Sequence, residues 1–100
     1  MNGETFRRHV IVTNPQGFHM RPLTAFAQLA NRFQSTVTVQ KGTQCSNGKS
    51  PLELMLLGAD LGTELILEVS GSDAHAAIDV LARFLAAPSA DDISDSPGAA

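Results

Sequence analysis

The chain has 100 residues, of which 43% are hydrophobic and 17% charged, with a formal net charge of −3. This length limits it to one domain of ordinary size and excludes a two-domain enzyme, while the hydrophobic content is sufficient for a packed core. Asp91, Asp92 and Asp95 carry three of the ten acidic charges, so residues 1–87 hold seven acidic and seven basic residues and are formally neutral.

Several classes of protein are disfavoured by this composition. There is no Trp or Tyr and no basic excess, so we expect no binding to nucleic acid. The longest apolar runs are far shorter than the roughly 18 residues that span a bilayer, so we expect no membrane insertion. Cys45 is the only cysteine, which excludes an intramolecular disulfide and a thiolate metal cluster. A cytoplasmic protein is expected.

The first half of the chain predicts a strand, a helix and a hairpin. Residues 6–13 place Val10 and Val12 on one face and Ile11 on the other, which is the period of a strand. From Pro22 onward, apolar residues recur at helical spacing. This stripe consists of Leu23, Phe26, Ala27, Ala30 and Phe33. Residues 36–40 and 43–47 read as two strands of a hairpin.

A short helix is predicted over residues 51–57. Ser50 is a favoured N-cap, Pro51 suits the first helical position, and Glu53 completes a capping box. Gly58 is the expected C-terminal cap. The bulky Leu54, Leu56 and Leu57 are expected in the core.

The remaining elements complete a βαββαβα order. Residues 64–70 alternate Leu65, Leu67 and Val69 with more polar positions, and Ser72 or Asp73 can cap a last helix. We predict an α+β open-faced β-sandwich in which the helices cross one face of a mostly antiparallel sheet. The domain is expected over residues 1–87, and the tail at 88–100, rich in Ala, Ser, Asp, Pro and Gly, is expected to be disordered.

The most reactive position is His19, at the predicted start of the first helix. A helix N-terminus offers unpaired N–H groups and a partial positive charge, both of which suit a phosphate. Neutral imidazole is nucleophilic near pH 7, and Arg21 supplies a permanent cation two residues on. His19 is therefore a candidate phosphoryl acceptor; the alternative is a histidine that only caps the helix.

A family resemblance strengthens this interpretation. The run at 17–22, Gly-Phe-His-Met-Arg-Pro, is followed by Asn-Gly-Lys-Ser at 47–50 and Leu-Gly-Ala at 57–59. This pair of motifs at this separation resembles HPr, the histidine-containing phosphocarrier family of the bacterial phosphoenolpyruvate-dependent phosphotransferase system. The resemblance extends from about residue 10 to residue 85. It implies a four-stranded antiparallel sheet with three helices on one face, which is the order derived above.

The resemblance also implies a function. Enzyme I, charged by phosphoenolpyruvate, would phosphorylate His19 on Nδ1, with Arg21 contacting the phosphate. The group would then pass to sugar-specific or regulatory acceptor proteins. Such a protein is a carrier and not an enzyme, and needs no cofactor or metal. We expect a monomer.

Two further roles follow from the resemblance. Ser50 matches the serine that a dedicated kinase phosphorylates in many HPr proteins, although capping alone explains its presence. The expected docking residues, by which Enzyme I and the acceptors would bind, are Phe18, Met20, Leu52 and Met55. Met20 replaces a usually small residue, Pro51 a common aliphatic one and Glu53 an often small one, which leaves the identity of the partners open.

Two other functions compete with the carrier. A regulatory binding module would use the docking surface and Ser50 but has no use for His19 together with Arg21. An enzyme with its own substrate pocket lacks a second acid, base or nucleophile. His9 and His75 are interpreted as surface or packing residues. The sequence leaves open whether the acceptors belong to sugar transport or to a nitrogen-regulatory branch.

Overall fold

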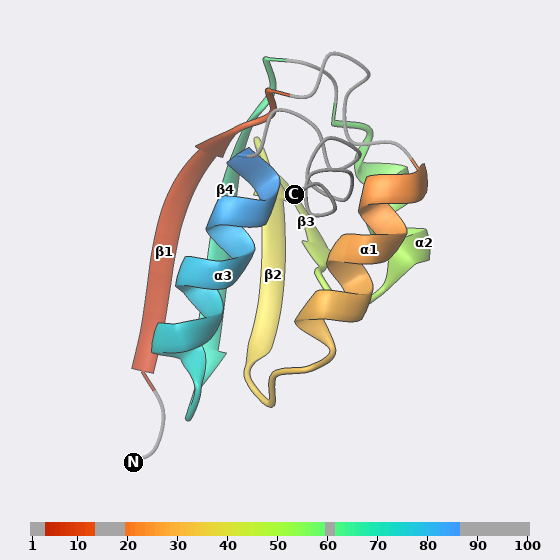
Figure 1. Ribbon diagram of the computed structural model, residues 1–100. Coiled ribbons are helices and arrows are strands. Elements are labelled where there is room, and N and C mark those ends of the chain that lie inside the picture. Colours follow the sequence, from red (N-terminus) through yellow and green to blue (C-terminus); the bar gives the residue numbers. More distant parts are fainter. Residues whose placement is uncertain (1–3, 14–19, 60–61, 87–100) are drawn as a thin grey trace, which may run out of the picture.

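The computed structural model describes residues 4–13, 20–59 and 62–86, and its elements follow the predicted βαββαβα order (Figure 1). The elements are β1 (Glu4–Ile11), α1 (Met20–Ala30), β2 (Thr36–Lys41), β3 (Gln44–Asn47), α2 (Pro51–Leu57), β4 (Glu64–Gly71) and α3 (Ala74–Ala86). The four strands form one antiparallel sheet in the order β1-β4-β2-β3. The helices lie on one side of this sheet, as the open-faced sandwich requires.

The central strand β4 organises the sheet. It pairs with β1 on one side, where Phe6 lies opposite Val69, and with β2 on the other, where Val39 lies opposite Leu67. Because side chains alternate along a strand, these residues all face the helices. Leu65, Leu67 and Val69 are completely buried there. The alternation predicted for residues 64–70 is therefore confirmed.

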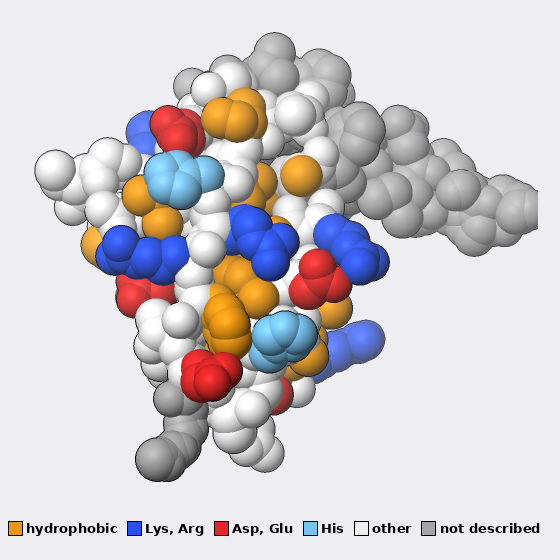
Figure 2. Space-filling view, turned by 90° about the vertical axis from the view of Figure 1, so that its left-hand side faces the viewer, with side chains coloured by type: hydrophobic (Ala, Val, Ile, Leu, Met, Phe, Trp, Pro, Cys, Tyr) orange, Lys and Arg blue, Asp and Glu red, His pale blue; other side chains and the backbone are white. Residues whose placement is uncertain are grey.

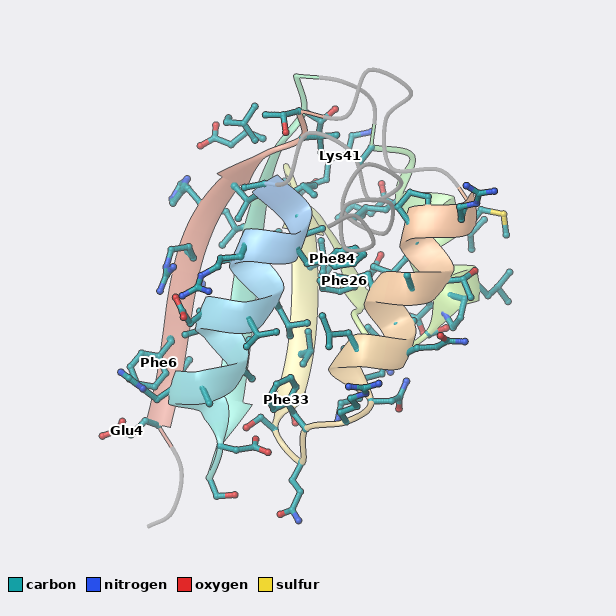
Figure 3. All side chains as sticks on the ribbon, viewed as in Figure 1. Glu4, Phe6, Phe26, Phe33, Lys41 and Phe84 are labelled. Atoms are coloured by element: carbon teal, nitrogen blue, oxygen red, sulfur yellow. The ribbon has the colours of Figure 1, made fainter. Side chains whose placement is uncertain are left out.

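The core lies between this sheet face and the two long helices. Phe26 of α1 is completely buried, and its ring centroid lies 6.0 Å from that of Phe84 on α3 (Figure 3). α1 contributes Leu23, Phe26, Ala27 and Ala30 to the core, while α3 contributes Ala74, Ala77, Ile78, Leu81, Ala82 and Leu85. Burying a large apolar side chain is worth about 1.5–3 kcal/mol, so this layer supplies most of the stability.

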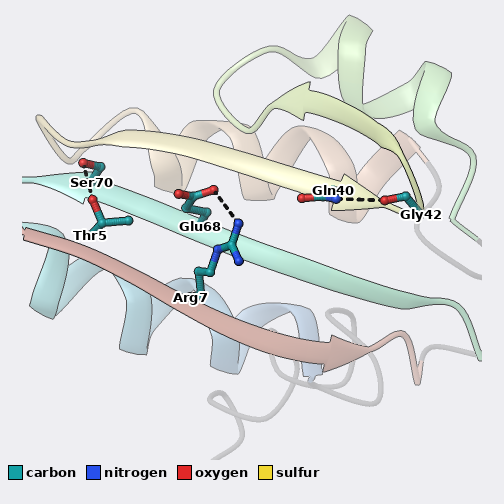
Figure 4. Close-up of polar contacts among 6 residues, drawn as sticks. All are labelled: Thr5, Arg7, Gln40, Gly42, Glu68 and Ser70. Atoms are coloured by element: carbon teal, nitrogen blue, oxygen red, sulfur yellow. Dashed lines mark hydrogen bonds and ion pairs between the residues drawn. The ribbon is translucent and has the colours of Figure 1, made fainter.

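The opposite face of the sheet carries polar side chains. Arg7 on β1 forms an ion pair with Glu68 on β4 at 3.8 Å, and the hydroxyl groups of Thr5 and Ser70 hydrogen-bond across the same strands at 2.9 Å (Figure 4). His9, also on this face, is exposed and contacts Glu64 at 2.7 Å. These contacts fit a face that is open to solvent.

Several boundaries differ from the predicted ones. The helical stripe runs to Phe33, but α1 ends at Ala30 and continues as a tighter turn. In that turn the N–H groups of Arg32 and Phe33 bond to carbonyls three residues earlier. The tight turn allows the chain to reverse into β2 while Phe33 still packs on the core. Strand β1 starts and ends two residues before the predicted positions, because its pairing with β4 runs from Glu4 to Ile11.

Asp73 joins the turn before β2 to the start of α3. Its carboxylate accepts hydrogen bonds from the backbone N–H groups of Gln34 at 2.8 Å and Ser35 at 3.0 Å, and from the Ser35 hydroxyl. The Ser35 hydroxyl and then the Gln34 N–H hold the pKa of Asp73 below its ordinary value. Asp73 therefore bridges two segments that are distant in sequence, besides being a candidate helix cap.

Gly71 permits this junction to close. A Cβ atom at this position would lie 2.7 Å from the Cα atom of Ser35, and the backbone φ of +148° is one that L side chains rarely adopt. Glycine is required both by space and by conformation.

We predict that Asp73→Asn lowers the urea midpoint at pH 7, because the neutral amide loses the charge that strengthens three hydrogen bonds. A lowered pKa in the folded state stabilises the protein above the ordinary carboxyl pKa, and this contribution is lost as the pH falls through the lowered value. The difference from wild type should accordingly shrink in acid. Asp79→Asn is the control, since its exposed pair with Arg83 contributes little. Equal midpoints at pH 7 would contradict the role of Asp73.

Candidate functional site

The start of α1 is built to remain electropositive. The helix begins at Met20, and no acidic residue occupies its first turn. Arg21 is exposed and Pro22 is buried. Proline has no backbone N–H, but this costs no hydrogen bond here, because the N–H groups of the first turn have no partner within the helix. Partial positive charge at this helix end is therefore not neutralised from within the helix. Phe18 and His19 precede Met20 and lie outside the described residues.

The start of α2 is different. The Ser50 Oγ atom accepts a hydrogen bond from the Glu53 N–H at 3.3 Å, which confirms Ser50 as the N-cap. The second half of the predicted capping box is wrong. The Glu53 carboxylate accepts from the Asn47 N–H at 2.8 Å, because the Ser50 N–H already donates to the Asn47 carbonyl. Glu53 thus fixes the end of β3 to the helix.

The turn between β3 and α2 is held close to both α1 and β2. A Cβ atom at Gly48 would lie 2.4 Å from a methyl carbon of Val37, so only glycine fits there. The Lys49 ammonium donates to the Phe33 carbonyl at 2.8 Å, and the Asn31 amide donates to the Lys49 carbonyl at 3.1 Å. These contacts hold the end of α1 against the start of α2. Each residue of the motif at 47–50 therefore has a structural role in this turn.

The other end of α2 is fixed by a residue that sequence reasoning did not single out. The Lys41 ammonium donates to the carbonyls of Leu57 at 3.1 Å and Gly58 at 2.9 Å. A cation at a helix C-terminus donates hydrogen bonds to carbonyls that have no partner in the helix, and it interacts favourably with the negative end of the helix dipole. Gly58 has the left-handed conformation predicted for the C-cap, with a φ of 67°.

Three adjacent apolar side chains of α2 face solvent, and we call them the α2 apolar patch. Leu52 is 63% exposed, Met55 44% and Leu56 70%. The exposure of Leu52 and Met55 fits their predicted use in docking. The prediction of Leu56 as a core residue is wrong, because Leu54 and Leu57 already fill the buried side of this two-turn helix. Exposed apolar groups this close together make the patch a candidate interaction surface.

Comparison with known proteins identifies the class of this site. Residues 6–87 match the protein family described as the PTS HPr component phosphorylation site. The chain belongs to the HPr family. It is a phosphocarrier of the phosphotransferase system and not an enzyme.

Individual HPr relatives agree in both sequence and fold. The phosphocarrier protein HPr of Neisseria meningitidis is 37% identical over 79 residues, which cover 79% of this chain and 89% of the relative. The HPr-like protein Crh of Bacillus subtilis is 39% identical over 69 residues, covering 69% and 81%. The crystal structure of HPr from Bacillus anthracis superimposes with a TM-score of 0.78 at 31% identity, covering 81% and 96%. The resemblance read from the sequence is confirmed.

The expected site residues of this HPr chain lie on two helices or outside the described residues. Arg21, Ser50, Leu52 and Met55 lie on α1 or at α2, two helices that pack against each other. Met20 is the first residue of α1, and His19 and Phe18 lie outside the described residues.

In the described ranges no three His, Cys, Asp or Glu side chains are grouped to hold a metal ion. Within the same ranges, no helix has the length and apolar character needed to span a membrane.

We predict that Ser50→Ala lowers the free energy of unfolding by about 1 kcal/mol, because the N–H of Glu53 loses its acceptor. Ser50→Asp should cost much less, since aspartate also caps helices well. Denaturant melts of both variants measure the difference. Equal stability of the alanine variant and the wild type would show that the cap is dispensable.

Proposed function

We propose that His19 is the phosphoryl acceptor of this carrier, that Enzyme I is its donor, and that sugar-specific or regulatory proteins of the phosphotransferase system are its acceptors. The observation that carries the proposal is the electropositive start of α1. Its first turn holds no carboxylate, and exposed Arg21 follows His19 by two residues. A dianionic phosphoryl group attached to the preceding residue would be attracted to this helix end.

The chemistry requires no group beyond these. The lone pair of the neutral His19 Nδ1 atom attacks phosphorus, the bond between phosphorus and the donor breaks, and the bonding pair leaves with the donor. Arg21 and the N–H groups of the first turn offset negative charge on the phosphoryl oxygens. Onward transfer reverses the same step toward an acceptor. A helix end stabilises a phosphate only moderately, which suits a group that must leave again.

The α2 apolar patch is the proposed docking surface for Enzyme I and the acceptors, together with Phe18 and Met20. α2 packs against α1, so partners bound to the patch would lie beside the helix that follows His19. The contacts of Lys41, Lys49 and Glu53 hold α2 at both ends. A surface held rigidly in this way loses little entropy when a partner binds.

A serine kinase acting on Ser50 is a second, regulatory part of the proposal. The Ser50 hydroxyl is half-buried and already caps α2, so a kinase would have to compete with the bond to Glu53. An added phosphate would lie two residues before Leu52 and would place negative charge beside the α2 apolar patch. A Ser50→Asp variant that accepts phosphate from Enzyme I at the wild-type rate would contradict this regulatory role.

We predict that His19→Ala abolishes phosphorylation by Enzyme I and phosphoenolpyruvate, and that Arg21→Ala slows transfer without unfolding the protein. Intact mass measures the phosphate on each variant, and quenched time points measure the rate. His75→Gln is the control, because this exposed histidine lies on α3, where its ring packs against Phe6. A phosphate that persists on the alanine variant would refute the assignment of His19, and unchanged rates would refute that of Arg21.

We also predict that Leu56→Ala raises the concentration needed for half-maximal transfer from Enzyme I while changing stability little, since this side chain is 70% exposed. Val80→Ala is the matched control, because Val80 is an exposed apolar residue on α3, away from α2. An equal effect of the two substitutions would show that docking does not use the α2 apolar patch.

A further inference from the structure

The side of the molecule formed by β1 and α3 contains a groove that the carrier function does not use. β1 is one of the two edge strands of the sheet, with β4 as its one neighbour. A hollow of about 340 Å³ lies between Arg8, Ile11 and their neighbours on β1 and Ala82, Arg83 and Ala86 on α3. A second hollow continues past Arg8 toward Phe6 and His75. We call the two hollows together the β1–α3 groove.

This groove contains a positive charge that its surroundings do not balance. Arg83 is paired at 2.8 Å with Asp79, which lines the second hollow, and His9 is hydrogen-bonded to Glu64 at 2.7 Å. Arg8 lines both hollows, and its guanidinium makes no ion pair or hydrogen bond with any described residue. Figure 2 shows basic side chains on this side of the molecule with apolar side chains between them. The groove therefore suits a segment that combines carboxylates with a few apolar groups.

The chain itself has such a segment immediately after α3. Residues 88–100 lie beyond the family match, which ends at 87, and they contain Asp91, Asp92 and Asp95 around a single large apolar residue, Ile93. The last residue of α3, Ala86, lines the groove, and its carbonyl accepts a hydrogen bond from the Thr13 hydroxyl at 2.9 Å. The chain therefore leaves α3 at the groove.

We propose that residues 88–100 bind in the β1–α3 groove of their own chain, with the aspartates beside Arg8 and Ile93 against the apolar part. An extended chain spans at most about 3.6 Å per residue, so Asp91 reaches up to about 18 Å from Ala86. That reach is enough to turn back along β1 toward Arg8, which shares the hollow with Ala86. Tethering gives the tail an effective concentration on the order of millimolar, so weak contacts suffice.

The consequence is a covered sheet edge. An uncovered edge strand invites pairing with other chains, and charged or folded-back segments prevent it. The tail would supply this cover without touching α1 or α2, so phosphoryl transfer would continue while it is bound.

NMR spectroscopy of the full-length protein tests the proposal. The variants are a triple substitution, Asp91→Asn with Asp92→Asn and Asp95→Asn, and the single substitution Arg8→Gln. We expect both to shift the amide signals of β1 near Arg8 and to reduce the heteronuclear NOE of the tail amides relative to wild type. Arg32→Gln is the matched control, because this exposed arginine lies in the turn after α1. Raising the salt from about 0.02 M to about 0.5 M should have the same effect as the triple substitution, since screening weakens exposed charge pairs.

Two results would overturn the proposal. One is a triple variant whose β1 and α3 signals superimpose on those of the wild type. The other is a set of shifts that grows with protein concentration and accompanies dimers in sedimentation equilibrium, which would assign the groove to the tail of a second copy.

Discussion

A four-stranded sheet that is apolar on one face alone is the constraint on which the rest of the molecule depends. Leu65, Leu67 and Val69 on the central strand are completely buried, while the alternate positions face solvent or are half-exposed. The free energy of burying this face is gained when helices cover it, so α1 and α3 must both lie on the same side. The crossover connections follow, because β1 and β4 are neighbours in the sheet but lie at opposite ends of the sequence.

This arrangement also fixes the position of the start of α1. α1 is anchored along its length by Leu23, Phe26 and Ala30, so its first turn is held at the rim of the core. At the other end of the helix, Asn31 and Lys49 connect it to α2. The start of α1 and the α2 apolar patch therefore belong to one packed unit.

The first turns of α1 and α2 differ in charge. α1 has no carboxylate in its first turn, whereas α2 has Glu53, whose charge is already bound to the Asn47 N–H. The first start remains available to an anion, and the second is satisfied from within the fold.

Local signals in the sequence determined the elements and the class of function. Alternation in residues 64–70, the Ser50-Pro51 start and Gly58 stop of α2, and the motifs at 17–22 and 47–50 are short-range patterns, so they could be read without coordinates. The tertiary structure alone decided the strand order, the bridge from Asp73 to Ser35, the Lys41 cap and the exposure of Leu56. Each of these depends on residues far apart in the chain that meet only after packing. An apolar residue in a two-turn helix carries no local signal that tells core from surface, because the neighbouring elements decide which side is covered.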